Sequence, residues 1–378
     1  MPVKKLRILH ITASYKPAYI YGGPIYSVAA LCEALVKEGN LVDVYTTTAN
    51  GTQELPVAKA TDVDGVNVYY FKRITKDHTH FSPSLLIHLF RNAKQYEVIH
   101  IHSWWNLVSV LSAFVCVLRG VKPVLSPRGM LSEYSRQQSN SILKKLIHII
   151  LGKQLLKRVR FHATSEQEAE EIRTVFKERA IRTNVIYNLV YLPACIPDKL
   201  PSSNVVLKLL FLSRVHEKKG LEMLFQAIAS LEFPFSLTIV GEGEKDYLEL
   251  LKEKVKNLKI SNCITWLDPV YGSKKFDLYS QFDLFVLPSY NENFANVVIE
   301  SLSVGTPVLI SKNVGLSAFV KSNKLGEVFD GSQEDLQLKI RKMMNDIADF
   351  NPERIRNTIL NDFDSGKQVN NYLDLYNS

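Results

Sequence analysis

The sequence of 378 residues lacks the features that mark disulfide-rich, metal-finger and membrane-spanning proteins. Its four cysteines are widely spaced, form no CxxC pair and stand among apolar neighbours, which predicts small core side chains in a reducing compartment. The longest apolar run, residues 107–118, has only 12 residues, whereas a membrane span needs about 20. The N-terminal apolar run is too short for a signal peptide and predicts a first strand. We therefore expect a cytoplasmic protein, at most peripheral at the inner face of the cytoplasmic membrane.

Two nucleotide-binding fingerprints are also missing. The chain has no GxxxxGK[ST] loop, which argues against a P-loop NTPase. The stretch IVGEGEKD has Asp246 where a dinucleotide fingerprint needs its third glycine. Gly241 and Gly243 still permit close approach to a ligand, and an ordinary tight turn is an equal alternative. The sequence has no internal repeat and no low-complexity segment.

Short apolar runs alternate with amphipathic helical patterns along the chain, and the alternation restarts near residue 204. This predicts an α/β fold of two Rossmann-like, doubly wound domains. The proline-containing stretch 192–204 is the expected linker. We expect an N-terminal domain of residues 1–197, a C-terminal domain of residues 198–364, and a C-terminal helix, 365–378, that packs back on the first domain. Ligands should bind in the cleft between the domains, beyond the carboxyl ends of the strands.

Lys and Arg exceed Asp and Glu by 46 to 38, a net charge of +8 that suits nucleic acid, anionic membranes or phosphorylated small molecules. Between Tyr134 and Arg160 there is no acidic residue. That stretch has seven basic ones: Arg136, Lys144, Lys145, Lys153, Lys157, Arg158 and Arg160. It predicts a basic amphipathic helix, which either lies on an anionic membrane or packs on the core with a basic outer face.

Two glycine- or cation-rich turns follow predicted strands. Gly22 and Gly23 precede Pro24 at the start of a predicted helix, where free N–H groups favour a phosphate, although an ordinary turn explains them equally well. Arg214, with Lys218 and Lys219, follows the first strand of the second domain. Arg and Lys are the usual groups that bind a diphosphate, and a solvated basic loop is the alternative.

His100 and His102 alternate along one predicted strand, and we expect them to point to opposite faces and not to form a metal pair. His102, at the carboxyl end of the strand, is the better candidate for contact with a ligand. Glu292 lies in a polar loop before a predicted helix that starts near Ala295, and Glu300 lies within that helix. A capping carboxylate and an exposed helix residue are the alternative interpretations of these two glutamates.

Six segments together resemble the retaining glycosyltransferases of the GT-B fold, glycosyltransferase family 4 (glycosyl transferases group 1). They run along nearly the whole chain, and the last contains the E-x7-E element of the family with Glu292 and Glu300. The segments are GGPIYSVAALCEAL, SPRGML, HATSEQEAEEI, LFLSRVHEKKGLEMLFQAI, LTIVGEGE and ENFANVVIESLSVGTPVLIS.

The resemblance implies roles for several residues on the donor, a nucleotide-diphosphate sugar. Arg214 and Lys219 would bind its diphosphate, and Glu300 would accept hydrogen bonds from its ribose. Glu292 would lie at the donor sugar and His102 near it. The backbone near the sugar and phosphates would be that of Asn293, Phe294, Ala295 and Asn296, with Gly22 and Gly23 approaching from the other domain. Arg128 stands where the family often has histidine, and Ala295 where it usually has glycine.

The function that follows is a retaining, metal-independent hexosyltransferase with a UDP- or GDP-sugar donor and no cofactor. Its acceptor would be a saccharide or lipid-linked saccharide of bacterial surface polysaccharide or lipopolysaccharide synthesis. The alternatives are a GT-B-fold UDP-sugar epimerase and a non-catalytic nucleotide-sugar-binding protein of polysaccharide assembly. A nucleic-acid-binding protein is disfavoured, because the basic residues fall at strand ends and on one helix without interleaved aromatic residues.

Overall fold

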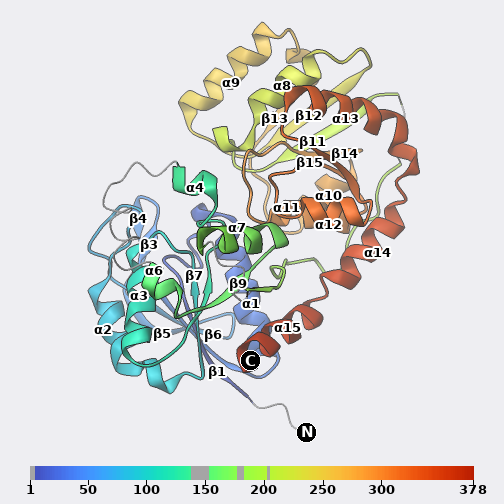
Figure 1. Ribbon diagram of the computed structural model, residues 1–378. Coiled ribbons are helices and arrows are strands. Elements are labelled where there is room, and N and C mark those ends of the chain that lie inside the picture. Colours follow the sequence, from blue (N-terminus) through green and yellow to red (C-terminus); the bar gives the residue numbers. More distant parts are fainter. Residues whose placement is uncertain (1–4, 138–152, 177–182, 202–204) are drawn as a thin grey trace. The chain divides into compact units, whose positions relative to one another are not determined.

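The computed structural model describes residues 5–137, 153–176, 183–201 and 205–378 (Figure 1). The described chain divides into two compact units. Unit 1 comprises residues 1–191 together with Ser365–Ser378, and unit 2 comprises Leu192–Asp364. The division falls six residues before the boundary expected from the sequence, and the C-terminal helix belongs to unit 1.

Unit 1 is built on a sheet of eight strands in the order β10-β9-β8-β7-β1-β2-β6-β5. All neighbours are parallel except β5, which pairs with β6 in the antiparallel sense. The strands of this sheet are β1 (Arg7–Ile11), β2 (Leu41–Thr47), β5 (Ala58–Val63), β6 (Val66–Phe71), β7 (Val98–His102), β8 (Val124–Ser126), β9 (Arg160–Ala163) and β10 (Thr183–Val185), and a separate small hairpin joins β3 (Ala49–Asn50) to β4 (Gln53–Glu54). The helices are α1 (Gly23–Lys37), α2 (Pro83–Asn92), α3 (Leu107–Leu118), α4 (Glu133–Gln137), α6 (Lys153–Leu156), α7 (Glu166–Phe176) and α15 (Ser365–Asn377).

Unit 2 is a fully parallel sheet of six strands in the order β13-β12-β11-β14-β15-β16. Its strands are β11 (Leu207–Leu212), β12 (Phe235–Val240), β13 (Ile264–Leu267), β14 (Leu284–Leu287), β15 (Val308–Ser311) and β16 (Gly326–Phe329). Its helices are α8 (Leu221–Ala229), α9 (Lys245–Asn257), α10 (Lys274–Ser280), α11 (Asn296–Ser303), α12 (Ser317–Ser322), α13 (Gln333–Asp346) and α14 (Pro352–Asp362). In unit 2 each connection between successive strands contains a helix, the usual crossover between parallel strands.

The strands of unit 1 have apolar side chains on both faces, because helices cover both. Ile8 packs into a core with α1 and α15, whereas its neighbour Leu9 packs into a second core with α2 and α3. Helix α15 lies beside α1 and supplies a run of buried side chains to the first core (Figure 1). Those side chains are Val369, Tyr372, Leu375 and Tyr376. Their i, i+3, i+7 spacing forms one apolar helix face.

The basic stretch of the sequence is only partly described. Lys144 and Lys145, on which the membrane hypothesis depends most, lie outside the described residues. Lys157 and Arg158 are exposed, but Arg160 is engaged within unit 1. Its guanidinium donates to the carbonyl oxygens of Leu375 and Ser378, at 3.0 and 3.1 Å, and so binds the end of α15. Among the described residues, no helix is both long enough and apolar enough to span a membrane.

The attachment of α15 leads to a stability prediction. Tyr372 is 1% exposed, and Tyr372→Ala should lower the free energy of unfolding by about 3–5 kcal/mol, because it removes an aromatic core side chain. Asn371→Ala, on the exposed side of the same helix, should change it by less than about 0.5 kcal/mol. Chemical denaturation followed by circular dichroism measures both. Equal effects would show that α15 is not part of the core of unit 1.

Candidate functional site

The candidate residues of unit 2 lie at the carboxyl edge of its sheet, around the central strand β11. This strand pairs with β12 on one side and β14 on the other, so the order of the strands reverses at β11. The loops after β11, β12 and β14 therefore meet at one edge. Ligands of doubly wound sheets bind at such a switch point.

Two of these loops are joined by an ion pair. Lys219, in the short helix Glu217–Lys219 after β11, donates to the Glu292 carboxylate after β14. The side chains are 14% and 23% exposed, so the pair is mostly shielded from water. Burial alone would raise the pKa of Glu292, but the charge and hydrogen bond of Lys219, with the charges of Lys218 and Arg214, bring that pKa below its ordinary value. The carboxylate is thus ionised at neutral pH.

The backbone of Glu292 is fixed by the loop after β15. Its N–H donates to the carbonyl oxygen of Asn313 at 3.0 Å, and its own carbonyl accepts from the N–H of Gly315 at 2.8 Å. The carboxylate of Glu292 pairs with Lys219, and α11 has no side-chain cap at its N-cap residue, Ala295. The contact that the structure shows for the Glu292 carboxylate is therefore an ion pair, and its interpretation as a helix cap stays a prediction.

Ala295 precedes α11 in a left-handed conformation, with φ 69° and ψ 76°. We expected the helix to start near Ala295 with a helical alanine, but the first helical residue is Asn296. A Cβ in the left-handed region crowds the following carbonyl oxygen, and only glycine adopts that region without cost. Asn293 and Asn296 beside it are half-buried, and Phe294 is buried with its ring 6.3 Å from that of Phe363.

The conformation of Ala295 predicts that glycine is better tolerated there. Ala295→Gly relieves about 1–2 kcal/mol of backbone strain, but it raises the entropy of the unfolded chain, which costs about 0.4–1 kcal/mol of stability. The protein should therefore be unchanged or more stable by up to about 1.6 kcal/mol. Ala227→Gly, inside α8, should destabilise by about 1 kcal/mol. Thermal unfolding of the two variants separates these effects. An equal loss in both would contradict the strain at position 295.

Glu300 is a buried carboxylate within α11, not an exposed helix residue. Lys275 of α10 donates to its Oε1 at 2.6 Å, and the Tyr279 hydroxyl donates to its Oε2 at 3.1 Å. A carboxylate can accept about four hydrogen bonds, so roughly two acceptor positions remain for a ligand. Lys275 and Tyr279 were missed by the sequence analysis. The two residues are four apart on a short predicted helix, a spacing that places their side chains on one face, where they can contact the same group.

Gly241 and Gly243 have a reason within the protein for lacking a side chain. A Cβ at Gly241 would lie 1.9 Å from the Ser213 carbonyl oxygen, and one at Gly243 would lie 2.5 Å from that of Val215. The loop after β12 thus runs against the loop after β11, and the Val215 N–H donates to the Glu242 carbonyl at 2.7 Å. The contacts of Gly241 and Gly243 support the interpretation as a tight turn. Contact of these glycines with a ligand stays a prediction.

Arg214 differs from Lys219 in having no acidic partner among the described residues. It lies two residues after the end of β11, and its side chain is exposed. It therefore offers a free planar donor group at the same edge as the Lys219–Glu292 pair.

In unit 1, Gly22 and Gly23 stand at the N-terminus of α1. Gly22 is the N-cap residue, with φ 76°, and makes no side-chain cap. Gly23 is exposed, and a Cβ added there would have no neighbour within 4 Å. In contrast to Gly241, Gly23 is thus not required to be glycine by contacts with the described chain.

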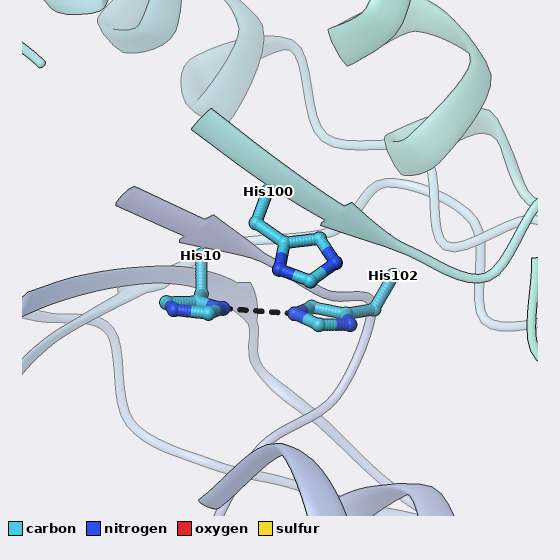
Figure 2. A group of neighbouring side chains, drawn as sticks. All are labelled: His10, His100 and His102. Carbon is cyan, nitrogen blue, oxygen red and sulfur yellow. Dashed lines mark hydrogen bonds between the residues drawn. The ribbon is translucent and has the colours of Figure 1, made fainter. Parts of the chain in front are cut away.

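The expectation for the histidines of β7 was wrong. Residues i and i+2 of a strand lie on the same face, and the His100 and His102 ring centroids are 4.2 Å apart. His10 of β1 joins them, and its ring lies edge to edge with that of His102 at an interplanar angle of 7° (Figure 2). The three rings are buried, and one nitrogen of each lies within 4.8 Å of the others, which is a spacing that a metal could use.

A fourth histidine, His162 of β9, adjoins these three, and hydrogen bonds occupy most of the ring nitrogens of the four. His162 has the Ile186 carbonyl at Nε2 and Ser126 Oγ at Nδ1. His100 has Ser126 Oγ at Nε2 and Tyr376 Oη at Nδ1, at 2.6 and 2.8 Å. A carbonyl oxygen can only accept, so a neutral His162 carries its proton on Nε2. His162 Nδ1 must then accept from the Ser126 hydroxyl, and Ser126 Oγ must accept from His100 Nε2–H. His100 Nδ1 in turn accepts from the Tyr376 hydroxyl.

A guanidinium directs the other two histidines. Arg128 can only donate, and its Nε lies 3.3 Å from His102 Nδ1. A neutral His102 therefore carries its proton on Nε2. This Nε2–H donates to His10 Nδ1 at 2.9 Å (Figure 2). The proton of His10 is then on Nε2, which is buried without a partner among the described residues. The cluster is best described as a hydrogen-bonded layer of neutral imidazoles beside a cation, which disfavours a metal ion.

This layer predicts acid sensitivity of unit 1. Burial lowers the pKa of all four imidazoles and the Arg128 charge lowers it further, to about 3 for His10 and His162 and well below 6.5 for His100 and His102. Below pH 6.5 the unfolded chain therefore binds more protons than the folded chain. An unfolded histidine is half protonated at pH 6.5, so each group should cost about 1 kcal/mol of stability between pH 6.5 and 5.5, or about 4 kcal/mol for the four groups.

Unit 2 is the internal control, because its single histidine, His216, is exposed. Hydrogen–deuterium exchange, corrected for the intrinsic effect of pH, should show strands β1 and β7 losing protection at pH 5.5 while β11 and β14 keep theirs. Equal losses in both units would contradict neutral, buried histidines.

The structure thus brings together Arg214, Lys219, Glu292 and the start of α11 at one edge of unit 2. Gly22, Gly23 and His102 lie at the carboxyl edge of the sheet in unit 1, where the strand order reverses at β1. Arg128 donates to His102 there, and Ser126 is hydrogen-bonded to the neighbouring His100.

The comparisons with solved structures agree with this architecture. The structure of Anabaena Alr3699/HepE in complex with UDP-glucose matches with a TM-score of 0.71 and 19% identity, over 98% of this chain and 99% of that one. WaaG, a glycosyltransferase involved in lipopolysaccharide biosynthesis, matches with a TM-score of 0.67 and 15% identity, over 93% and 95% of the two chains. The fold is therefore the GT-B fold of glycosyltransferases.

Family models cover both units. The model described as Glycosyltransferase Family 4 matches residues 21–192, and the model described as Glycosyl transferases group 1 matches residues 196–358. An uncharacterized glycosyltransferase of Methanocaldococcus jannaschii is 26% identical over 341 residues, which are 84% of this chain and 83% of that protein. The chain belongs to glycosyltransferase family 4, the glycosyl transferases group 1. It is a nucleotide-sugar-dependent glycosyltransferase.

Proposed function

We propose that this protein is a retaining, metal-independent hexosyltransferase of bacterial surface polysaccharide or lipopolysaccharide synthesis. It transfers a hexose from a UDP- or GDP-sugar to a saccharide or lipid-linked saccharide at the inner face of the cytoplasmic membrane. The observation that carries the proposal is the grouping of Arg214, the Lys219–Glu292 pair and Glu300 in unit 2. The UDP-glucose bound by HepE and the lipopolysaccharide pathway of WaaG support the donor and the product class.

The donor nucleotide would bind across the carboxyl edge of unit 2. Glu300 has acceptor positions left beyond Lys275 and Tyr279, which suit the two hydroxyl groups of a ribose. Arg214 and Lys219 would bind the diphosphate. The N–H groups at the start of α11 would add a partial positive charge beside the phosphates.

The same groups account for the chemistry. Cleavage of the bond between sugar and diphosphate leaves negative charge on the leaving phosphate, and cations preorganised at that point stabilise the transition state. These cations are side chains of the chain itself, which is the basis for metal independence. Glu292 is ionised but committed to Lys219, so we assign it to orientation of the sugar and not to covalent attack. The acceptor then attacks from the face of the leaving phosphate, with retention of configuration.

The test uses Arg214, because its substitution should not disturb the fold. UDP or GDP, with the matching sugar donor, should raise the melting temperature of the wild-type protein. Arg214→Met should weaken nucleotide-diphosphate binding by about 30-fold, the effect of losing a charge-assisted bidentate contact of about 2 kcal/mol, with little change in the melting temperature of the free protein.

Lys256→Met on the exposed side of α9 is the charge-matched control and should bind the nucleotide like the wild type. Isothermal titration calorimetry gives the three affinities. Absence of stabilisation by every nucleoside diphosphate and its sugars would overturn the proposed donor. Wild-type affinity in Arg214→Met would remove that residue from the site.

A further inference from the structure

Arg128 is a cation in the interior of unit 1 whose direct partners are all neutral. It follows β8 in the loop after Ser126 and is half-buried. Its NH1 donates to Ser27 Oγ at 3.0 Å and to Asn188 Oδ1 at 3.1 Å. Its Nε and NH2 share the single acceptor His102 Nδ1, each at 3.3 Å. Ser27, Asn188 and His102 are themselves buried.

No carboxylate within the described residues forms an ion pair with Arg128. The acidic side chain that bears on it electrostatically, Glu168, is engaged elsewhere: its Oε1 accepts from the Gly129 N–H, and its Oε2 accepts from the Thr164 N–H and hydroxyl. Burial lowers the pKa of Arg128, but an arginine keeps its proton at any ordinary pH. Among the described residues its positive charge is thus offset through space by Glu168, but by no direct ion pair.

A partly buried charge without a direct ion-pair partner loses hydration, and a ligand of opposite charge that contacts it would restore that loss. The backbone at Arg128 is also strained, because this residue adopts a positive φ of 54°. A guanidinium has five N–H groups, and with one acceptor shared between Nε and NH2, at least one NH2 hydrogen has no acceptor among the described residues. The Arg128 guanidinium therefore has a positive charge and at least one N–H group that a ligand could bind.

The surroundings of Arg128 favour an anion further. Ser27 belongs to α1, a helix of 15 residues that starts at Gly23 without a side-chain cap. Pro24 has no N–H, and the Ile25 N–H donates to the Gly22 carbonyl at 3.0 Å, so this helix end contributes mainly its positive partial charge. The space at Gly23 is open. His10, His100, His102 and His162 are neutral, so they neither compete for an anion nor supply one.

We propose that Arg128 binds an anionic oxygen group, a carboxylate or a phosphate, that is carried by a sugar substrate of the enzyme. The proposal rests on the proposed function and specifies its substrate class. Arg214 and Lys219 of unit 2 already provide for the diphosphate of the donor, so a neutral hexose and a neutral acceptor would leave the charge of Arg128 unused. The planar fork of arginine suits both carboxylate and phosphate oxygens.

The experiment measures binding of matched charged and neutral sugars to the full-length protein by calorimetry. The donor arm compares UDP-glucuronate with UDP-glucose, and the acceptor arm compares glucose 6-phosphate with glucose in the presence of UDP. The wild type should prefer the anionic member of one pair by at least about tenfold, because a charged contact is gained. The arm that shows the preference identifies whether donor or acceptor carries the anion.

Variants connect that preference to the residue. Arg128→Gln should abolish it, Arg128→Lys should keep part of it, and both should bind UDP itself within about twofold of the wild type. Arg160→Gln is the matched control, because Arg160 lies in the same unit with its guanidinium bound to backbone carbonyls, and it should keep the full preference. The charge preference itself is measured on the wild-type protein, so that part of the test does not depend on whether any variant folds.

Three results would overturn the inference. One is the absence of any charge preference in both arms, and another is a preference that survives Arg128→Gln. The third is an equal loss of affinity for UDP alone in Arg128→Gln, which would assign Arg128 to the diphosphate. All three are read from a protein that binds UDP, whereas failure of the proposed function itself would appear as no nucleotide binding at all.

Discussion

Each sheet is organised by one central strand that is hydrogen-bonded on both sides by parallel neighbours. β1 lies between β7 and β2, and β11 lies between β14 and β12. Because the order of the chain reverses at these strands, the loops that follow them diverge and leave room for a ligand at the carboxyl edge. The pairing of β11 with β14 positions Lys219 to reach Glu292, and the pairing of β1 with β7 places His10 directly opposite His100. The candidate chemistry of both units is a consequence of strand order.

The two central regions use their buried faces differently. In unit 2 the faces of β11 are apolar almost throughout, and polar groups begin only beyond the strand end. In unit 1 imidazoles replace apolar side chains on the face of β1 and β7 under α1 and α15. Such a layer is stable only when its members are satisfied and uncharged, and the chain from the Ile186 carbonyl through Ser126 to Tyr376 meets that condition. α15 is thus tied to this layer by a hydrogen bond as well as by apolar packing.

The alternation of strands and helices and the restart of the pattern were sufficient to predict two doubly wound sheets, because both depend on local periodicity. Features set by tertiary contact were not accessible in the same way. The partners of Glu300 come from α10, and the steric need for glycine at 241 arises from the neighbouring loop. The left-handed backbone at Ala295 had no local signal, since alanine normally favours helix. The faces of His100 and His102 were accessible from the two-residue repeat of a strand, and the prediction misapplied it.

Charge compensation is what distinguishes the two sites. Lys219 is paired with Glu292 and Lys275 with Glu300, so these acid–base pairs of unit 2 are satisfied without a ligand. Of the candidate residues described at that edge, Arg214 is the cation without an acidic partner. In unit 1, Arg128 follows β8 and donates to neutral acceptors alone. A satisfied pair can orient a neutral hydroxyl or sugar with little electrostatic bias, whereas a guanidinium without a direct ion-pair partner favours negative charge. The selectivity of the enzyme for charged substrates should therefore reside in unit 1, although the cations proposed for the diphosphate lie in unit 2.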